Sequence, residues 1–381
     1  MANSKWRESA EAIRGEIERG ALKSGDHLPS ETEVADHWRV SRMTAHRAMA
    51  YLQNLGLVNR QRRKGTTVAG EGERRAGIVA LLFHHRNDSL ELQYLLGVRS
   101  GIPDDDHLLL WNTENNPKRE AYYLERASEE ANGIICFPTC APENTPIIHR
   151  IVEKGTPIVC LDRVPKDAPV DAVLTDNYRA TLNALRFMRE HGHQRIAYIT
   201  ENRMEVSAVW ERYEAYLTAM AEAGIEDVYP YVRKLLCDLG FHTDLLTQTI
   251  GDALQCMLNL PQPPTAVFCM HDYYLAAVLE CCDILGIKVP EDLEIISFND
   301  CPPLVPRFSR SVNRIVQQAQ VIGKLAAQRL QLRLEGEVMQ PETIKVMAHF
   351  YPARHIRAVN LDEGPDQGKP RFIQSETIVT G

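Results

Sequence analysis

The sequence predicts an α/β protein: a small winged helix-turn-helix head, followed by a larger body of two lobes, each built on a doubly wound parallel sheet. Short apolar runs alternate with helical patterns through most of the chain, which is typical of parallel sheets covered by helices. This alternation takes up too many of the 381 residues for a single sheet, so we expect two lobes. The first 75 residues follow another pattern, short helices and a basic hairpin, which predicts a separate head.

Charge is divided unevenly between the head and the body. The whole chain has a formal net charge of −8, yet residues 1–75 contain 14 Lys and Arg residues against 10 Asp and Glu residues. The head therefore carries +4, and the remaining residues carry −12. A small basic head on an acidic body predicts an anionic partner for the head alone.

Composition excludes several classes of protein. Apolar residues make up 44% of the chain and charged residues 25%, the usual mixture of a soluble globular protein. No apolar run approaches the roughly eighteen residues of a membrane-spanning helix, so we expect no membrane partner. The first residues are charged and lack the apolar core of a secretory signal, so we expect a cytoplasmic protein. The nine cysteines form no Cys-x-x-Cys pair, which favours reduced, packed thiols over disulfides or zinc.

The head contains three helical patterns. Residues 5–20 place apolar side chains at helical spacing, and Gly20 ends that helix. Ser30 and Glu33 match a capping box at the start of a second, short helix. Ser41 is a good N-cap for a third helix. The face of that helix expected to pack inward consists of Ala45, Ala48, Met49 and Leu52.

The opposite face of the third helix suits contact with DNA. It carries Met43, His46 and Arg47, and Arg42 and Thr44 lie on its flanks. Arg47 is close to opposite the inward face, so we expect it to read a base edge, typically of guanine. Arg42 and Thr44 occupy the first turn, where backbone amides and the helix dipole also favour a phosphate. This helix is therefore predicted to enter the major groove.

A basic hairpin follows the third helix. Residues 57–60 and 66–68 form two short runs around a tip that contains Arg62, Arg63 and Lys64. A solvated charge run is the alternative interpretation of these three cations. Their position beside a helix-turn-helix pattern favours a wing that contacts DNA.

These residues together resemble a known family. Leu28-Pro29-Ser30-Glu31, Val40-Ser41-Arg42-Met43-Thr44 and Gly65-Thr66-Thr67-Val68 are similar to the GntR-type winged-helix DNA-binding domain over residues 4–70, closest to its HutC-like branch. The resemblance implies that Arg42 and Thr44 contact DNA and that Gly65 lets the wing approach the minor groove. The expected DNA-binding set is Ser30, Glu31, Ser41, Arg42, Met43, Thr44, His46, Arg47, Arg62, Arg63, Lys64, Gly65 and Thr66.

The head also departs from the family pattern. Many relatives carry Arg where this chain has Thr32, and many carry Arg where it has His46. The resemblance therefore does not fix the operator sequence.

Residues 71–75 read as a linker to the body, which we expect to span residues 76–354. Residues 355–381 are sparse in apolar side chains and are expected to form a flexible tail.

The body is expected to alternate strands and helices. The expected strands are Ile78–Phe83, Leu108–Trp111, Gly133–Phe137, Pro157–Leu161, Ile196–Thr200, Thr265–Met270 and Leu293–Phe298. The expected helices are residues 88–100, 117–131, 178–191, 205–224, 271–286 and 316–335.

The body resembles a second family. Leu161-Asp162-Arg163, the run from Gly192 to Ile199 and the run from Val289 to Asp300 are similar to the LacI/GalR-type effector domain, itself similar to periplasmic sugar-binding proteins. This resemblance implies a two-lobed periplasmic-binding-protein-like domain. It also implies that the chain crosses between lobes near residues 175, 305–312 and 338. A sugar or another small polar metabolite would bind in the cleft between the lobes.

The resemblance also assigns ligand-binding positions. Asp162, Arg212, His271 and Asn299 match positions that hydrogen-bond the ligand, and aromatic residues near strand ends offer stacking faces. The expected ligand-binding set is Phe83, Asp162, Trp210, Arg212, Phe241, His271 and Asn299. Each has an alternative: Asp162 could pair with its neighbour at the surface, Trp210 could belong to the core, and Arg212 could pair with a nearby glutamate. Relatives usually have Asn at 271 and Asp at 299, so the ligand need not be a common hexose.

The sequence contains no catalytic or phosphate-binding signature, so we expect neither an enzyme nor a cofactor. His84 and His85 point apart on an extended chain, which argues against a metal site.

The function expected is a ligand-responsive bacterial repressor that binds pseudo-palindromic operator DNA as a homodimer. This combination resembles the arabinose-responsive repressor type. Two alternatives stay open: a regulator whose body binds a protein partner or no ligand, and a solute-binding module without regulation.

Overall fold

The computed structural model describes residues 2–54, 56–61, 65–69, 77–83, 89–236, 243–299, 312–336, 340–353 and 359–360. The chain divides into two compact units. The first contains Met1–Leu174, Glu205–Ser207 and Ala319–Val346, and the second contains Thr175–Met204, Ala208–Gln318 and Met347–Gly381. The expected α/β class with parallel sheets is confirmed. Because this division groups the head with the first lobe, the domain limits expected from the sequence stay predictions.

The head has a helical core closed by a hairpin. Its elements are α1 (Ala2–Glu18), α2 (Glu31–Trp38), α3 (Arg42–Asn54), β1 (Val58–Gln61) and β2 (Gly65–Val68). The two strands pair in antiparallel register, with Val58 opposite Val68. Ala45, Ala48, Met49 and Leu52 are all buried, as their helical spacing predicts. Trp6 and Tyr51 extend this core, with their rings in an edge-to-face contact.

The first lobe is built on a mostly parallel sheet. Its elements are β3 (Ile78–Phe83), α4 (Ser89–Gly101), β4 (His107–Asn112), α5 (Pro117–Glu130), β5 (Gly133–Cys136), the 3-10 turn η1 (Pro142–Asn144), α6 (Thr145–Glu153), β6 (Ile158–Leu161), β7 (Asp171–Thr175), α12 (Ala319–Leu334) and β13 (Thr343–Val346). The strand order is β13-β7-β6-β5-β3-β4. The strands from β7 to β4 run parallel.

Each face of this sheet has its own apolar core. Leu81 and Ile135 face one core, which includes residues of α4 and α12. Ala80 and Ile134 face the other, which includes residues of α5 and α6. Because successive residues of a strand point to opposite faces, the uninterrupted apolar run of β3 serves both cores.

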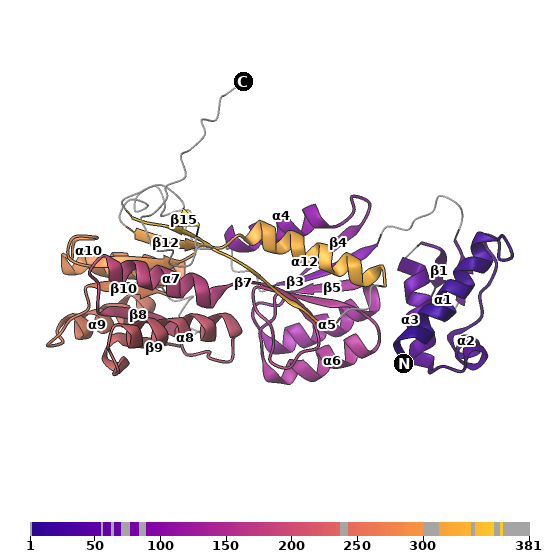
Figure 1. The fold of residues 1–381 in the computed structure, drawn as a ribbon, viewed down its shortest axis with the longest axis horizontal. Helices are drawn as coiled ribbons and strands as arrows, with labels where there is room; N and C mark the ends of the chain where they lie inside the picture. Colours follow the sequence, from indigo (N-terminus) through magenta and orange to yellow (C-terminus); the bar gives the residue numbers. More distant parts are fainter. Residues whose placement is uncertain are drawn as a thin grey trace, which may run out of the picture. The chain divides into compact units, whose positions relative to one another are not determined.

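Two helices far apart in sequence lie side by side on the first lobe, α4 and α12 (Figure 1). Their contact depends on glycine. A methyl group added at Gly97 would lie 2.3 Å from the backbone oxygen of Gln320, and one added at Gly323 would lie 2.4 Å from the backbone oxygen of Tyr94. The two backbones therefore approach so closely that neither glycine position can hold a larger residue without separating the helices.

The second unit is also built on one sheet. Its elements are α7 (Asn177–Glu190), β8 (Ile196–Glu201), α8 (Ser207–Glu222), η2 (Tyr229–Tyr231), β9 (Val232–Leu235), α9 (Thr243–Leu258), β10 (Ala266–Cys269), α10 (Asp272–Leu285), β11 (Glu294–Phe298), β12 (Val312–Val316), β14 (His349–Tyr351) and β15 (Val359–Asn360). The order is β15-β14-β12-β11-β10-β8-β9, parallel from β9 to β12 and antiparallel from β12 to β15. Apart from β15, the expected tail lies outside the described residues.

Two further observations bear on the expectations from composition. Within the described part of the chain, no helix is long and apolar enough to cross a membrane. Seven cysteines are described as free thiols, and six of them are buried. Burial raises the pKa of the Cys281 thiol to about 11, so that thiol stays protonated at neutral pH.

Candidate nucleic-acid interface and ligand site

One carboxylate in the head gathers three basic side chains. Glu31, at the start of α2, accepts a hydrogen bond from Nδ1 of His46 in α3 at 2.8 Å. Arg60 in β1 donates to the same oxygen, Oε1 of Glu31. Nε of Arg42 lies 4.0 Å from the other oxygen, and the Arg42 side chain is 78% exposed. We call these four residues the Glu31 cluster; it joins α2, α3 and the hairpin.

Helix caps hold the cluster in place. The Ser30 hydroxyl accepts from the amide of Glu33 at 3.3 Å, and the Glu33 carboxylate accepts from the amide of Ser30 at 2.7 Å. The predicted capping box is therefore confirmed. Hydrogen bonds from Ser30 lower the pKa of Glu33 below its usual value. The Ser41 hydroxyl accepts from the amide of Thr44 at 3.1 Å. Both serines of the expected DNA-binding set thus fix the start of a helix.

Charge in the cluster is not fully balanced. Burial lowers the pKa of the Arg60 guanidinium, although the Glu31 carboxylate acts in the opposite direction. Arg60 stays charged at neutral pH, because an arginine titrates far above it. One glutamate therefore faces two arginines and a histidine, which leaves the cluster cationic. A cationic surface beside the exposed start of α3 suits a phosphate backbone.

The other expected DNA-binding residues lie around this cluster or outside the described residues. Met43 is 45% exposed on α3. Gly65 begins β2 with a φ of +91°, in the left-handed region that glycine prefers, and Thr66 follows it. Arg62, Arg63 and Lys64 lie outside the described residues.

The placement expected for Arg47 is wrong. Its guanidinium lies over the Trp6 ring, 4.7 Å from the ring centroid, and the side chain is half-buried. Burial lowers the pKa of Arg47, and Arg333 lowers it further. The prediction from helical spacing failed because the rings of Trp6 and Tyr51 pack on the side of α3 that carries Arg47. That side of the helix is therefore partly buried as well. Contact between Arg47 and DNA stays untested.

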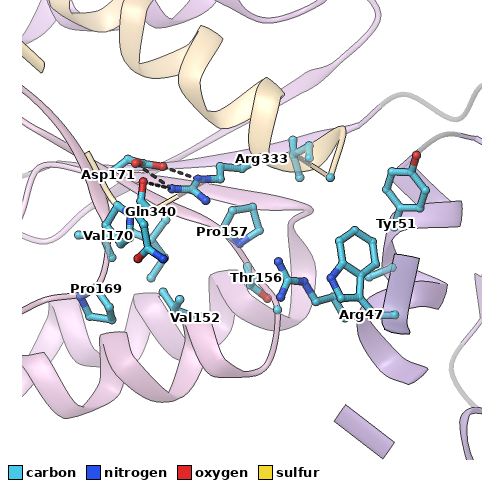
Figure 2. A pocket seen from close by; sticks show the side chains of 17 residues that line it. Arg47, Tyr51, Val152, Thr156, Pro157, Pro169, Val170, Asp171, Arg333 and Gln340 are labelled. Carbon is cyan, nitrogen blue, oxygen red and sulfur yellow. Dashed lines mark hydrogen bonds and ion pairs between the residues drawn. The ribbon is translucent and has the colours of Figure 1, made fainter. Parts of the chain in front are cut away.

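Arg47 also lines a pocket of about 320 Å³ within the first unit. Figure 2 shows its side chain pointing toward Thr156, with Tyr51 beside it on α3. On the lobe side, Arg333 donates to the Asp171 carboxylate at 2.6 and 3.0 Å. Arg47 thus lies in the wall of a pocket and not on the exposed face of α3.

Asp171 is the main buried carboxylate of this pocket wall. It is 2% exposed and also accepts from Arg329 at 3.2 Å and from the amide of Glu342 at 2.8 Å. Burial alone would raise the pKa of Asp171, but the donors from Arg333, Glu342 and Arg329 together hold it below its usual value. Asp171 stays charged and ties β7 to α12.

The second unit brings three of the expected ligand-binding residues to the carboxyl edge of its sheet. Arg212, 5% exposed, donates from Nε to Oδ1 of Asn177 at 2.9 Å and from Nη1 to the backbone oxygen of Met270 at 3.0 Å. Its guanidinium lies 3.5 Å from the centroid of the Phe298 ring. Met270 and Phe298 directly precede His271 and Asn299. Arg212 therefore lies next to both positions.

His271 and Asn299 end neighbouring strands in different ways. His271 is the N-cap of α10, and its Nδ1 lies 2.6 Å from a carboxylate oxygen of Asp272 and 3.3 Å from the amide nitrogen of Tyr273. Asn299 is 4% exposed and has a φ of +74°. Its side-chain oxygen accepts from Gln317 at 2.5 Å, and Gln317 accepts from the Thr175 hydroxyl at 2.5 Å.

The expected aromatic residues are less clearly placed. Trp210 is 46% exposed and touches Tyr213 edge-on, so it is not a core residue. Phe241 lies outside the described residues. In the first unit, Phe83 ends β3 and packs partly against the core on the α4 side.

Asp162 follows β6 in the first unit with a φ of +63° and is 5% exposed. It accepts from the Tyr94 hydroxyl at 2.9 Å and also forms an ion pair with Arg163 at 3.7 Å. The alternative pairing with Arg163 is therefore present, but Asp162 is buried and the pair does not lie at the surface. Sequence reasoning did not single out Tyr94, Gln317 or Arg60, since each acts through a partner far away in sequence.

Comparison with known proteins gives the family. Residues 7–68 match the model of bacterial regulatory proteins of the gntR family, and residues 185–352 match that of a periplasmic binding protein-like domain. The chain is 32% identical over 252 residues to the probable HTH-type transcriptional repressor ExuR of Bacillus subtilis, covering 65% of this chain and 68% of that one. The chain belongs to the HTH-type transcriptional regulators.

Solved structures of such regulators share the fold. The transcription regulator CcpA of Lactococcus lactis superposes with a TM-score of 0.64, at 20% identity, over 74% of this chain and 99% of that chain. The complex of the transcriptional regulator CelR with cellobiose gives 0.61, at 22% identity, over 85% and 98%. The regulator therefore joins a GntR-type head to an effector domain of the periplasmic-binding-protein type, and its domains are those of transcription regulators rather than enzymes.

Proposed function

We propose that this regulator is a repressor that binds a pseudo-palindromic operator as a homodimer in the bacterial cytoplasm. We further propose that a small polar metabolite, a sugar, modulates this binding through the body. In this proposal residues 1–70 form the DNA-binding head, residues 71–75 the linker and residues 76–354 the effector domain.

The Glu31 cluster carries the DNA-binding part of the proposal. It holds Arg60 of the hairpin and His46 of α3 against one carboxylate, so the hairpin and the helix form one surface. The Arg42 side chain lies beside them and is largely exposed to solvent. The expected DNA-binding residues Ser30, Glu31, Ser41, Arg42, Met43, Thr44, His46, Gly65 and Thr66 surround this surface, and Arg62, Arg63 and Lys64 belong to the same proposal.

The polar groups at the carboxyl edges of the two sheets support the effector part. Ligands of open α/β sheets bind outside these edges. Asp162 in the first unit and Arg212, His271 and Asn299 in the second offer planar acceptors and donors that match sugar hydroxyls. Phe83, Trp210 and Phe241 are proposed as stacking faces.

The test begins with selection of duplexes from a random library by the full chain. Fluorescence anisotropy then measures affinity for the enriched duplex between 50 and 300 mM salt, which we choose as a range of roughly sixfold in concentration. We expect affinity to fall steeply as salt rises, because bound phosphates release counterions. Arg42→Ala should bind more weakly. Failure to enrich any duplex overturns the DNA-binding proposal.

A thermal-shift panel tests the effector part separately. Arabinose, cellobiose and other monosaccharides and disaccharides are added to the full chain. The true ligand should raise the melting temperature by an amount that grows with its concentration relative to its dissociation constant, and should change affinity for the selected duplex. No shift with any sugar, together with intact DNA binding, would favour a body that binds a protein partner or no ligand.

A further inference from the structure

His46 occupies the position on α3 where the resemblance leads one to expect an arginine. The two side chains differ in an important way, since arginine only donates hydrogen bonds whereas each histidine ring nitrogen either donates or accepts. The contact that the ring makes inside the protein decides which nitrogen does which. For His46 that contact is with Glu31, through Nδ1.

The geometry fixes the proton on Nδ1. A carboxylate can only accept, so a distance of 2.8 Å between Nδ1 and Oε1 of Glu31 requires that Nδ1 donates. Nη2 of Arg60 lies 3.3 Å from the same Nδ1, but arginine has no acceptor and Nδ1 has no lone pair left for it. In the neutral ring, Nε2 is then left as an acceptor.

We propose that Glu31 sets the tautomer of His46 and thereby determines which base edge the recognition helix reads. This proposal rests on the proposed DNA-binding function. Neutral His46 presents an acceptor at Nε2, which suits the amino group of cytosine or adenine in the major groove. Protonated His46 presents a donor, which suits O6 and N7 of guanine. An arginine at this position would read guanine at every pH.

Charged groups of both signs lie beside His46. Among the described residues, the Glu31 carboxylate of α2 and the Arg60 guanidinium of β1 both lie within 3.3 Å of its Nδ1. Arg42, on the same helix, shares Glu31 with both. Because histidine is the side chain that ordinarily changes charge between pH 5 and 8, the base preference should change within that range.

The experiment compares base preference at two pH values. The full chain selects duplexes from a random library at pH 5.5 and at pH 8.0, values we choose about one unit or more on either side of the ordinary histidine pKa of roughly 6.5. Anisotropy then ranks the four versions of the position that changes. We expect roughly tenfold preference for guanine at the lower pH, replaced by cytosine or adenine at the higher pH.

Three variants separate this mechanism from a merely structural role of the cluster. His46→Arg should prefer guanine at both pH values. Glu31→Leu removes the acceptor that keeps the proton on Nδ1, so Arg60 can donate to Nδ1 and Nε2 becomes the donor; guanine should then be preferred at pH 8.0 as well. His37→Gln is the matched control, since His37 is an exposed histidine of α2 outside the cluster, and it should keep the pH-dependent change.

The outcomes are distinct. An enriched sequence that is the same at both pH values overturns the role of His46 while leaving the DNA-binding proposal intact. A wild-type pH change that Glu31→Leu leaves untouched overturns the role of Glu31. If no duplex is enriched at either pH, the DNA-binding function and this inference both fail.

Discussion

Replacing Arg212 by alanine should destabilise the second unit strongly. The guanidinium donates to two buried acceptors, Oδ1 of Asn177 and the backbone oxygen of Met270, and stacks on Phe298. Leaving a buried acceptor without a donor costs about 1–3 kcal/mol, and a desolvated cation–π contact contributes about 2 kcal/mol. We therefore expect a loss on the order of 5 kcal/mol, a large part of the roughly 5–15 kcal/mol that stabilises a typical domain.

Urea denaturation of the full chain, followed by circular dichroism, measures this loss. Arg233→Ala is the matched control, because Arg233 is an exposed arginine of the edge strand β9 in the same unit. The control should unfold at the wild-type urea concentration, and Arg212→Ala should unfold at a clearly lower one. An unchanged midpoint for Arg212→Ala would refute the argument that these contacts stabilise the unit and would leave Arg212 free for a role in ligand binding alone.

Three further changes test other parts of the structure. Asp171→Asn should cost about 3 kcal/mol in urea denaturation, since it breaks a buried carboxylate–arginine network. The lowered pKa of Asp171 means that its contribution is fully present at neutral pH and is lost as pH falls below about 4, so the difference from wild type should shrink there. Ser30→Ala should lower stability by about 1 kcal/mol in thermal denaturation, through loss of the α2 cap, and an unchanged melting temperature would contradict this. Arg42→Ala should reduce the slope of log affinity against log salt by about 1, and an equal slope would mean that Arg42 contacts no phosphate.

The sequence predicted buried strands better than exposed ones. The run Ile78–Phe83 appears as β3 with the same bounds, because a strand covered on both faces is apolar without interruption. The edge strand β9 was missed, since Arg233 and Lys234 are exposed there and break the apolar run. The helix α6 was missed as well: it has only nine residues and begins with Thr-Pro, which reads as a turn.

Site residues could be predicted where local periodicity decides their position. Met43 and Arg42 are exposed on α3 as the helical spacing indicates. Arg47 was misplaced because Trp6, more than forty positions earlier in the chain, covers its side of the helix. The contact between Glu31 and Arg60 likewise depends on how the hairpin folds back, which no local pattern reveals. Residue types could be read from the sequence, but their partners depend on tertiary packing.

The glycine contact between α4 and α12 has a consequence for biosynthesis. The ribosome finishes most of the first lobe before it reaches residue 319, yet the core on the α4 side includes Ala319, Ile322, Ala326 and Leu330. Until α12 emerges, this core, which includes Val98 and Leu81, lacks the side chains that α12 contributes, and part of its apolar surface is exposed. A nascent chain halted before residue 319 should therefore be a substrate for proteases, and this lobe can be completed only after residues 319–346 have been translated.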